Sequence, residues 1–171
     1  MVFTAQNRTL TEVLRAVVEG LSQCSNVVLV RIWLIKPGDI CATCRFRPEC
    51  PDQTRCLHMV ARAGHSDDPK NDHTRLDGGF RRFPMGVRKI GRVGQTGEPL
   101  LLPGVRGDED WIADPKWMKR ENVRTVAAQP LVFRGEVLGV IALFDKGVLS
   151  DEDFQWLRVF ADHAPRPRQV R

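Results

Sequence analysis

The chain of 171 residues lacks the features of a membrane or a secreted protein. Its longest strongly apolar run, residues 27–35, is far shorter than the roughly 20 residues that a membrane-spanning helix needs. The first residues contain neither the basic start nor the apolar stretch of a signal peptide. We therefore expect a cytoplasmic protein that does not contact a membrane.

An excess of positive charge is also missing from most of the chain. The net formal charge is +5, but Arg166, Arg168 and Arg171 supply three of these charges, so residues 1–165 carry only +2. This balance does not favour nucleic-acid binding. With 42% hydrophobic residues, the chain is not of the disordered class. We expect one domain at residues 1–164 and a disordered basic tail at 165–171.

Hydrophobic periodicity predicts an alternation of helices and strands. Residues 10–21 have the apolar stripe of an amphipathic helix, and Thr9 with Glu12 fits a capping box. Strands are expected at 27–35, 56–63, 81–85, 99–102, 123–133 and 137–144, and further helical segments at 89–96, within 108–121 and after Ser150. Terminal helices on one face of a mainly antiparallel sheet make an α+β architecture.

Three segments of this sequence follow one another in a recognisable order. The first is IGRVGQTGEPL at residues 90–100. The second is the closing hairpin, with QPL at 129–131 and GEVLGVIAL at 135–143. The third is LSDED at 149–153, which opens the last helix. Together they resemble the GAF domain family of sensory modules, in which the first segment is similar to a G-x-V-x-x-T-G-E-P passage, and the resemblance covers most of the chain.

The resemblance implies a six-stranded antiparallel sheet, with the terminal helices on one face and a ligand cavity under loops on the other. It also implies a regulatory domain that controls an output domain in signal transduction or transcription, and a homodimer through the terminal helices, where Trp156 and Phe160 form a second apolar stripe. Of the family's cyclic-nucleotide signature, only Lys146 and Asp153 are present. We therefore expect a ligand other than a cyclic nucleotide.

The ligand cavity implied by the resemblance contains mainly apolar side chains, as small-molecule pockets usually do. The same side chains could instead fill the core, and the sequence leaves both interpretations open. The expected cavity residues are Phe83, Ile90, Val93, Trp111, Trp117, Met118 and Gln129.

Four of the five cysteines fall in residues 38–56, which we call the cysteine excursion. Such a cluster favours a metal centre over a disulfide framework in a cytoplasmic protein. The candidate ligands are Cys41, Cys44, Cys50 and Cys56. The single Cys-x2-Cys pair and the loose remaining spacings favour an iron–sulfur cluster; the alternative is structural zinc in an interaction module that binds no small ligand. Redox-active thiols without a metal remain a third possibility.

Two further interpretations concern thiol chemistry and metal ligation. Some GAF proteins reduce free methionine sulfoxide with cysteine thiols, but four clustered cysteines exceed what thiol exchange requires, so we expect no enzyme. His58 follows Cys56 by two residues and shares its strand face, so it could replace a ligand. A histidine with an ordinary hydrogen bond is the preferred interpretation.

Overall fold

A computed structural model describes residues 9–65 and 75–163, so the tail that we expect to be disordered lies outside the described residues. None of the helices in these ranges is long and apolar enough to cross a membrane. The elements are α1 (Leu10–Ser22), β1 (Val27–Pro37), the 3-10 turn η1 (Arg47–Glu49), β2 (Arg55–Gly64), β3 (Arg82–Pro84), α2 (Arg88–Thr96), β4 (Leu100–Pro103), α3 (Pro115–Arg120), β5 (Thr125–Phe133), β6 (Glu136–Asp145) and α4 (Asp151–His163).

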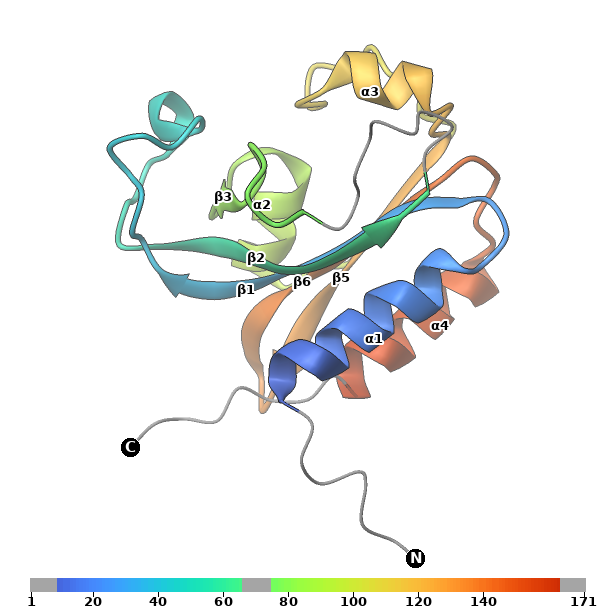
Figure 1. Ribbon diagram of the computed structural model, residues 1–171, viewed down its shortest axis with the longest axis horizontal. Coiled ribbons are helices and arrows are strands. Elements are labelled where there is room, and N and C mark those ends of the chain that lie inside the picture. The colour runs from blue at the N-terminus through green and yellow to red at the C-terminus, as the bar shows by residue number, and fades with distance from the viewer. Residues whose placement is uncertain (1–8, 66–74, 164–171) are drawn as a thin grey trace, which may run out of the picture.

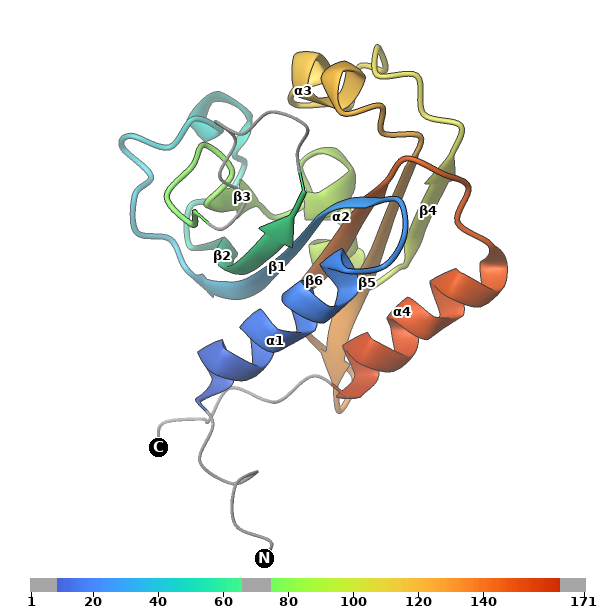
Figure 2. The ribbon, with the colours of Figure 1, turned by 45° about the vertical axis from the view of Figure 1, so that its right-hand side comes forward.

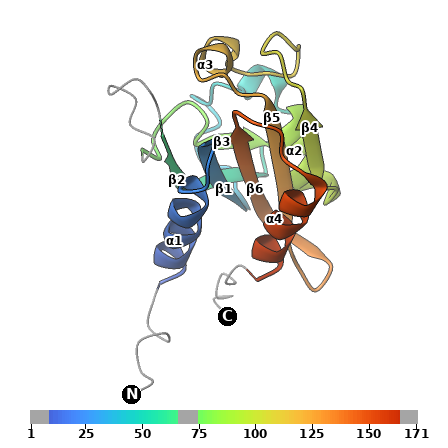
Figure 3. The same cartoon turned by 90° about the vertical axis from the view of Figure 1, so that its right-hand side faces the viewer.

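The six strands form one curved antiparallel sheet in the order β3-β2-β1-β6-β5-β4 (Figure 1). The first strand of the chain, β1, therefore lies between β2 and β6 in the middle of the sheet. Helices α1 and α4 lie side by side on one face, and α2 and α3 lie on the other. This arrangement confirms the predicted α+β architecture. In the side view of Figure 3, α3 lies at the top, and α1 and α4 lie below it.

The face that carries the terminal helices has a buried apolar layer. The stripe of α1 buries Leu14 and Val18 against Val30 and Ile32 of β1, and α4 adds Leu157. Burying a large aliphatic side chain contributes roughly 1.5–3 kcal/mol, so this layer supplies much of the stability of the sheet.

Both terminal helices begin at the predicted caps. The Thr9 amide donates to Glu12 Oε2 at 2.8 Å, and the Glu12 amide donates to Thr9 Oγ1 at 3.3 Å. At α4, the Asp153 amide donates to Ser150 Oγ at 3.1 Å. These bonds satisfy amides that the first helical turn leaves free.

The opposite face of the sheet is covered less evenly. Because side chains alternate along a strand, the neighbours of Val30 and Ile32 on β1, Arg31 and Trp33, point away from the terminal helices. Trp33 is 1% exposed and packs near Phe83 of β3, with their ring centroids 6.3 Å apart. The cysteine excursion lies beside β3 on this face (Figure 2). The cavity described below opens on the same face.

The structure explains why glycine occupies two positions of the 90–100 motif, Gly91 and Gly97. A Cβ on Gly91 of α2 would lie 2.2 Å from the carbonyl oxygen of Pro84 in β3. Only glycine lets the helix approach the strand so closely. Gly97 has φ 72° and ends α2, with its amide donating to the Val93 oxygen at 2.9 Å.

We predict that Gly91→Ala lowers the free energy of unfolding by about 1–3 kcal/mol, because the added methyl group forces α2 away from β3. The control is Gly20→Ala in α1, where a Cβ meets nothing within 4 Å. That change should leave the stability equal or raise it by up to about 1 kcal/mol. Urea denaturation measures both. Equal effects of the two substitutions would contradict the close-approach explanation.

Candidate functional site

A cavity of about 340 Å³ lies between the sheet and the segments that cover its second face. Its floor comes from β1, β2 and β6, including Trp33, Met59 and Phe144. Its cover comes from residues 78–80, α2, residues 111–114 and α3. Trp117 of α3 meets Phe144 edge to face, with the ring centroids 5.4 Å apart. The size and the aromatic walls suit a small organic molecule.

The structure brings together five of the seven residues expected at the cavity. They are Phe83, Ile90, Trp111, Trp117 and Met118. Val93 does not line the cavity, because it is 3% exposed and buried within the apolar cluster beneath α2.

The expected placement of Gln129 requires a correction. On β5, Ala128 lies in the cluster on the cavity face, so its neighbour Gln129 points to the opposite face. There the Gln129 Nε2 donates to the Phe154 oxygen of α4 at 3.5 Å. Gln129 therefore connects β5 to the last helix and is absent from the cavity wall.

Cationic side chains dominate the polar part of the cavity wall. Its basic lining residues in the described chain are Arg31, Arg45, Arg62, Arg88, Lys89 and Arg120, and its acidic lining residue is Asp114. Arg88 is paired with Glu49 at 2.7 Å. Arg120, more than half exposed, lies 3.6 Å from Glu121. The wall therefore carries a net positive charge.

Arg31 is the most deeply buried of these cations. Its side chain rises from the central strand β1 and is 9% exposed. Its Cζ atom lies 5.0 Å from the Phe80 ring centroid and 5.8 Å from that of Phe144. Its Nε atom has no hydrogen-bond partner among the described residues. Burial, and then the charge of Arg62, lowers the pKa of Arg31 to about 9, although Asp114 opposes the shift.

The sequence contains evidence that Arg31 is a functional candidate, although hydrophobic periodicity alone does not single it out. Arg31 interrupts the apolar run at residues 27–35 in the middle of a strand with both faces covered. A charge at such a position is costly unless something pairs with it. An unexplained cation in a buried strand is therefore a candidate for ligand binding.

The cysteine excursion forms part of the cavity wall. The Cζ atom of Arg45 lies 4.7 Å from the Phe80 ring centroid, and Arg45 itself lines the cavity. Phe46 is 3% exposed and packs on Phe83, with the ring centroids 4.7 Å apart. The Glu49 carboxylate accepts two hydrogen bonds from Arg88 of α2, at 2.7 and 3.1 Å.

The four clustered cysteines do not line the main cavity. They surround a separate void of about 20 Å³ at the end of the sheet, together with Asp39, Arg47 and Arg82 among others. As the side chains stand, the described residues contain no group of three His, Cys, Asp or Glu that could hold a metal ion. All five cysteines are free thiols.

Cys56 and His58 both lie on β2 near this void. Burial raises the pKa of the Cys56 thiol to about 11, against the lowering effect of Arg82. The His58 Nε2 lies 2.9 Å from the Pro37 carbonyl oxygen. Burial and then Arg82 lower the pKa of His58, and Nε2 donates the hydrogen bond, because a carbonyl oxygen can only accept. His58 is absent from the lining of the void and has a structural hydrogen bond.

Comparison with known proteins identifies the family of this chain. Residues 9–164 match the GAF domain, and the chain belongs to that family. A probable 3',5'-cyclic phosphodiesterase, pde-5, from Caenorhabditis elegans is 32% identical over 82 residues. That match spans 47% of this chain and 11% of the relative, so most of the relative has no counterpart here.

Solved structures show the same fold at low sequence identity. The GAF domain of a phosphoenolpyruvate-protein phosphotransferase from Coxiella burnetii has a TM-score of 0.64 at 17% identity, covering 93% of this chain and 82% of that one. The nlh2 GAF domain of A. aeolicus has a TM-score of 0.60 at 22% identity, covering 91% and 82%. A type II free methionine-R-sulfoxide reductase from Thermoplasma acidophilum has 0.61 at 15% identity, covering 91% of each chain.

We predict that Arg31→Met raises the free energy of unfolding of the ligand-free protein by about 1–3 kcal/mol. The methionine keeps most of the volume between Phe80 and Phe144 and removes a desolvated charge, as when buried ion pairs are replaced by apolar side chains. The control, Arg120→Met, changes an exposed cation and should shift stability by no more than about 0.5 kcal/mol. Thermal and urea denaturation measure both. A destabilised Arg31→Met protein would show that Arg31 serves the fold.

Proposed function

We propose that the domain is a signal-sensing regulatory module whose cavity binds a small organic anion with a planar apolar part. The observation that carries this proposal is the Arg31 guanidinium, buried in the cavity floor with a free Nε donor. Membership of the GAF family supports the sensing role.

The chemistry of the cavity selects the class of ligand. Burying the Arg31 cation costs several kcal/mol of desolvation; Asp114 offsets part of this cost by its charge, and a carboxylate or phosphate in the cavity would offset more. Guanidinium groups bind such anions through paired hydrogen bonds. The rings of Trp111, Trp117 and Phe144 offer faces and edges to an aromatic or flat apolar body.

The position of Arg31 also offers a route by which binding reaches the rest of the molecule. Its strand neighbours Val30 and Ile32 pack in the same apolar layer as α1 and α4. A ligand that pulls on β1 therefore acts on the layer beneath the terminal helices. We propose that these helices pass the signal to an output domain of the kind found with sensory domains in signal transduction or transcription.

Binding, and not catalysis, is the role we propose for this chain. Free methionine-R-sulfoxide reductases share the fold, but at these identities the likeness concerns the fold alone. In the described residues, the thiols lie around their own void and outside the main cavity wall. A substrate held near Arg31 would not contact them.

Calorimetric titration with four probes tests the ligand class: benzoate, indole-3-acetate, AMP and cyclic GMP. We expect saturable binding of at least one, with quenching of tryptophan fluorescence. Arg31→Met should weaken it at least about 30-fold, since losing one partner of a buried charge pair costs roughly 2–5 kcal/mol. The control is Arg158→Met, an exposed cation on α4.

Two results would contradict this proposal: no binding by any probe, or equal affinities in the wild-type and Arg31→Met proteins. Cyclic GMP serves a separate purpose. The C. elegans relative is a probable cyclic phosphodiesterase, whereas the incomplete signature at Lys146 and Asp153 predicts that cyclic nucleotides are not the ligand. Selective binding of cyclic GMP would overturn that narrower prediction and support the anion class.

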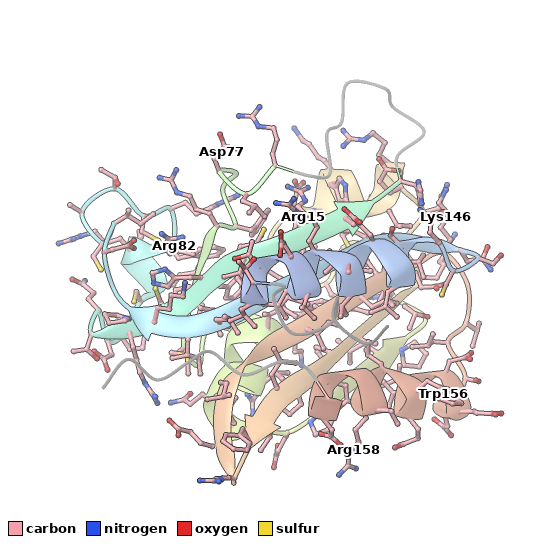
Figure 4. All side chains as sticks on the ribbon, turned by 60° about the horizontal axis from the view of Figure 1, so that its bottom comes forward. Arg15, Asp77, Arg82, Lys146, Trp156 and Arg158 are labelled. Carbon is pink, nitrogen blue, oxygen red and sulfur yellow. The ribbon has the colours of Figure 1, made fainter. Side chains whose placement is uncertain are left out.

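We propose that the partner of the terminal helices is a second copy of this chain. Trp156 of α4 is 60% exposed and Val159 is 46% exposed. Figure 4 shows Trp156 on α4, the helix that lies next to α1. The side chain of Phe160, which completes the expected stripe, lies outside the described side chains. Exposed aromatic side chains are enriched at protein interfaces.

Trp156→Ser should raise the dimer dissociation constant about tenfold or more, as loss of an aromatic anchor usually does. Sedimentation velocity over a concentration series measures the effect. Val132→Ser, at an exposed position at the far end of β5, is the matched control and should leave the constant unchanged. A wild-type protein that stays monomeric at all concentrations would contradict the dimer.

A further inference from the structure

We propose that Cys41, Cys44, Cys50 and Cys56 bind one zinc ion, which fastens the cysteine excursion to the end of the sheet. All four line the same small void, although they are spread over 16 residues of sequence. Cys24, the remaining cysteine, is exposed after α1 and does not line it.

The thiols must turn to reach a common ion, because no three of them form a metal-binding group in the described residues as placed. The Cys41 Sγ lies 3.6 Å from the Gln53 oxygen and the Cys50 Sγ lies 3.2 Å from the Asp52 oxygen, both within the excursion. Cys56 is fixed on β2, where it pairs with Lys36 of β1 and Pro84 of β3. On binding, Cys41 and Cys50 turn from these carbonyl oxygens, all four thiols point into the void, and each releases its proton to the solvent.

The size of the void favours a single ion. A volume of about 20 Å³ is close to that of one probe-sized particle, whereas an iron–sulfur cluster brings several iron and sulfide atoms. Zinc with four thiolates is tetrahedral and carries a net charge of about −2. Arg47 and Arg82 line the same void, but so do Asp39 and Asp52, and Asp39 is paired with Arg82, so the charge of the lining does not distinguish the two centres.

The ion would also stiffen the wall of the main cavity. Arg45 and Phe46 lie between the second and third cysteines, and both contact the aromatic residues that line that cavity. Glu49, directly before Cys50, holds Arg88 of α2. The expectation that zinc changes the ligand affinity of the cavity rests on the proposed function. The expectation that the cysteines bind zinc is independent of it.

Metal analysis of the purified chain, with acid-labile sulfide, tests the site, followed by cobalt(II) titration of the stripped protein. We expect about one zinc per chain, no labile sulfide, and the intense visible bands of tetrahedral cobalt thiolate. Cys41→Ala and Cys50→Ala should each weaken zinc binding by roughly 100-fold or more. Loss of a residue that only hydrogen-bonds to a metal ligand typically weakens binding about 10–100-fold, and loss of a ligand should cost more. Cys24→Ala is the matched control and should bind zinc normally.

The loop variants keep the test independent of folding, because Cys41 and Cys50 lie outside the strands, whereas Cys56→Ala alters β2. Hydrogen exchange of residues 38–56 should rise when zinc is removed. Three results would overturn the proposal: no bound metal, iron with matching sulfide, or zinc retained equally by the Cys41→Ala/Cys50→Ala double variant. Failure of anion binding alone would leave the zinc result standing.

Discussion

The cavity on the second face of the sheet is arranged around one buried cation on the central strand. Arg31 lies in β1, which pairs with β2 and β6, so it cannot move toward solvent without breaking both ladders. Phe80 and Phe144 surround its guanidinium and offset part of the desolvation. The second face of the sheet thus has a cavity with a charge in its floor, whereas the first face has an apolar layer between the sheet and the terminal helices.

The covering segments adapt to that constraint in different ways. Arg88 and Arg120 in the cover have carboxylate neighbours in Glu49 and Glu121, which reduces the repulsion that a wall of cations would otherwise produce. Arg45 lies over the Phe80 ring. The positive potential of the cavity is thus concentrated at its floor, where a bound anion is most desolvated and its interaction with a cation strongest.

Much of the fold was predictable because its signals are local. Caps at Thr9 and Ser150 and the stripe of α1 depend on neighbouring residues, and they place the terminal helices correctly. The face of the sheet on which Gln129 lies could not be predicted in this way. Its strand is buried on both sides, so apolar residues stand at successive positions and do not show which side faces the cavity. Arg31 was missed for the related reason that a strand buried on both faces does not show which face is hollow.

The contacts of the cysteine excursion with the rest of the domain could not be predicted from the sequence. Spacing identifies four candidate ligands, but it cannot show that the segment between them carries Phe46 into the same aromatic cluster as Phe83. Nor can it show that Asp39, at the start of the excursion, is fixed by two hydrogen bonds from Arg82, at 2.8 and 2.7 Å. That guanidinium holds the pKa of Asp39 well below its usual range, so the pair stays charged as the solution is acidified. Ion pairs at Asp39 and Glu49 and the buried Phe46 tie the excursion to β3 and α2. A change at the cysteines therefore acts on the cavity wall through contacts that are already formed.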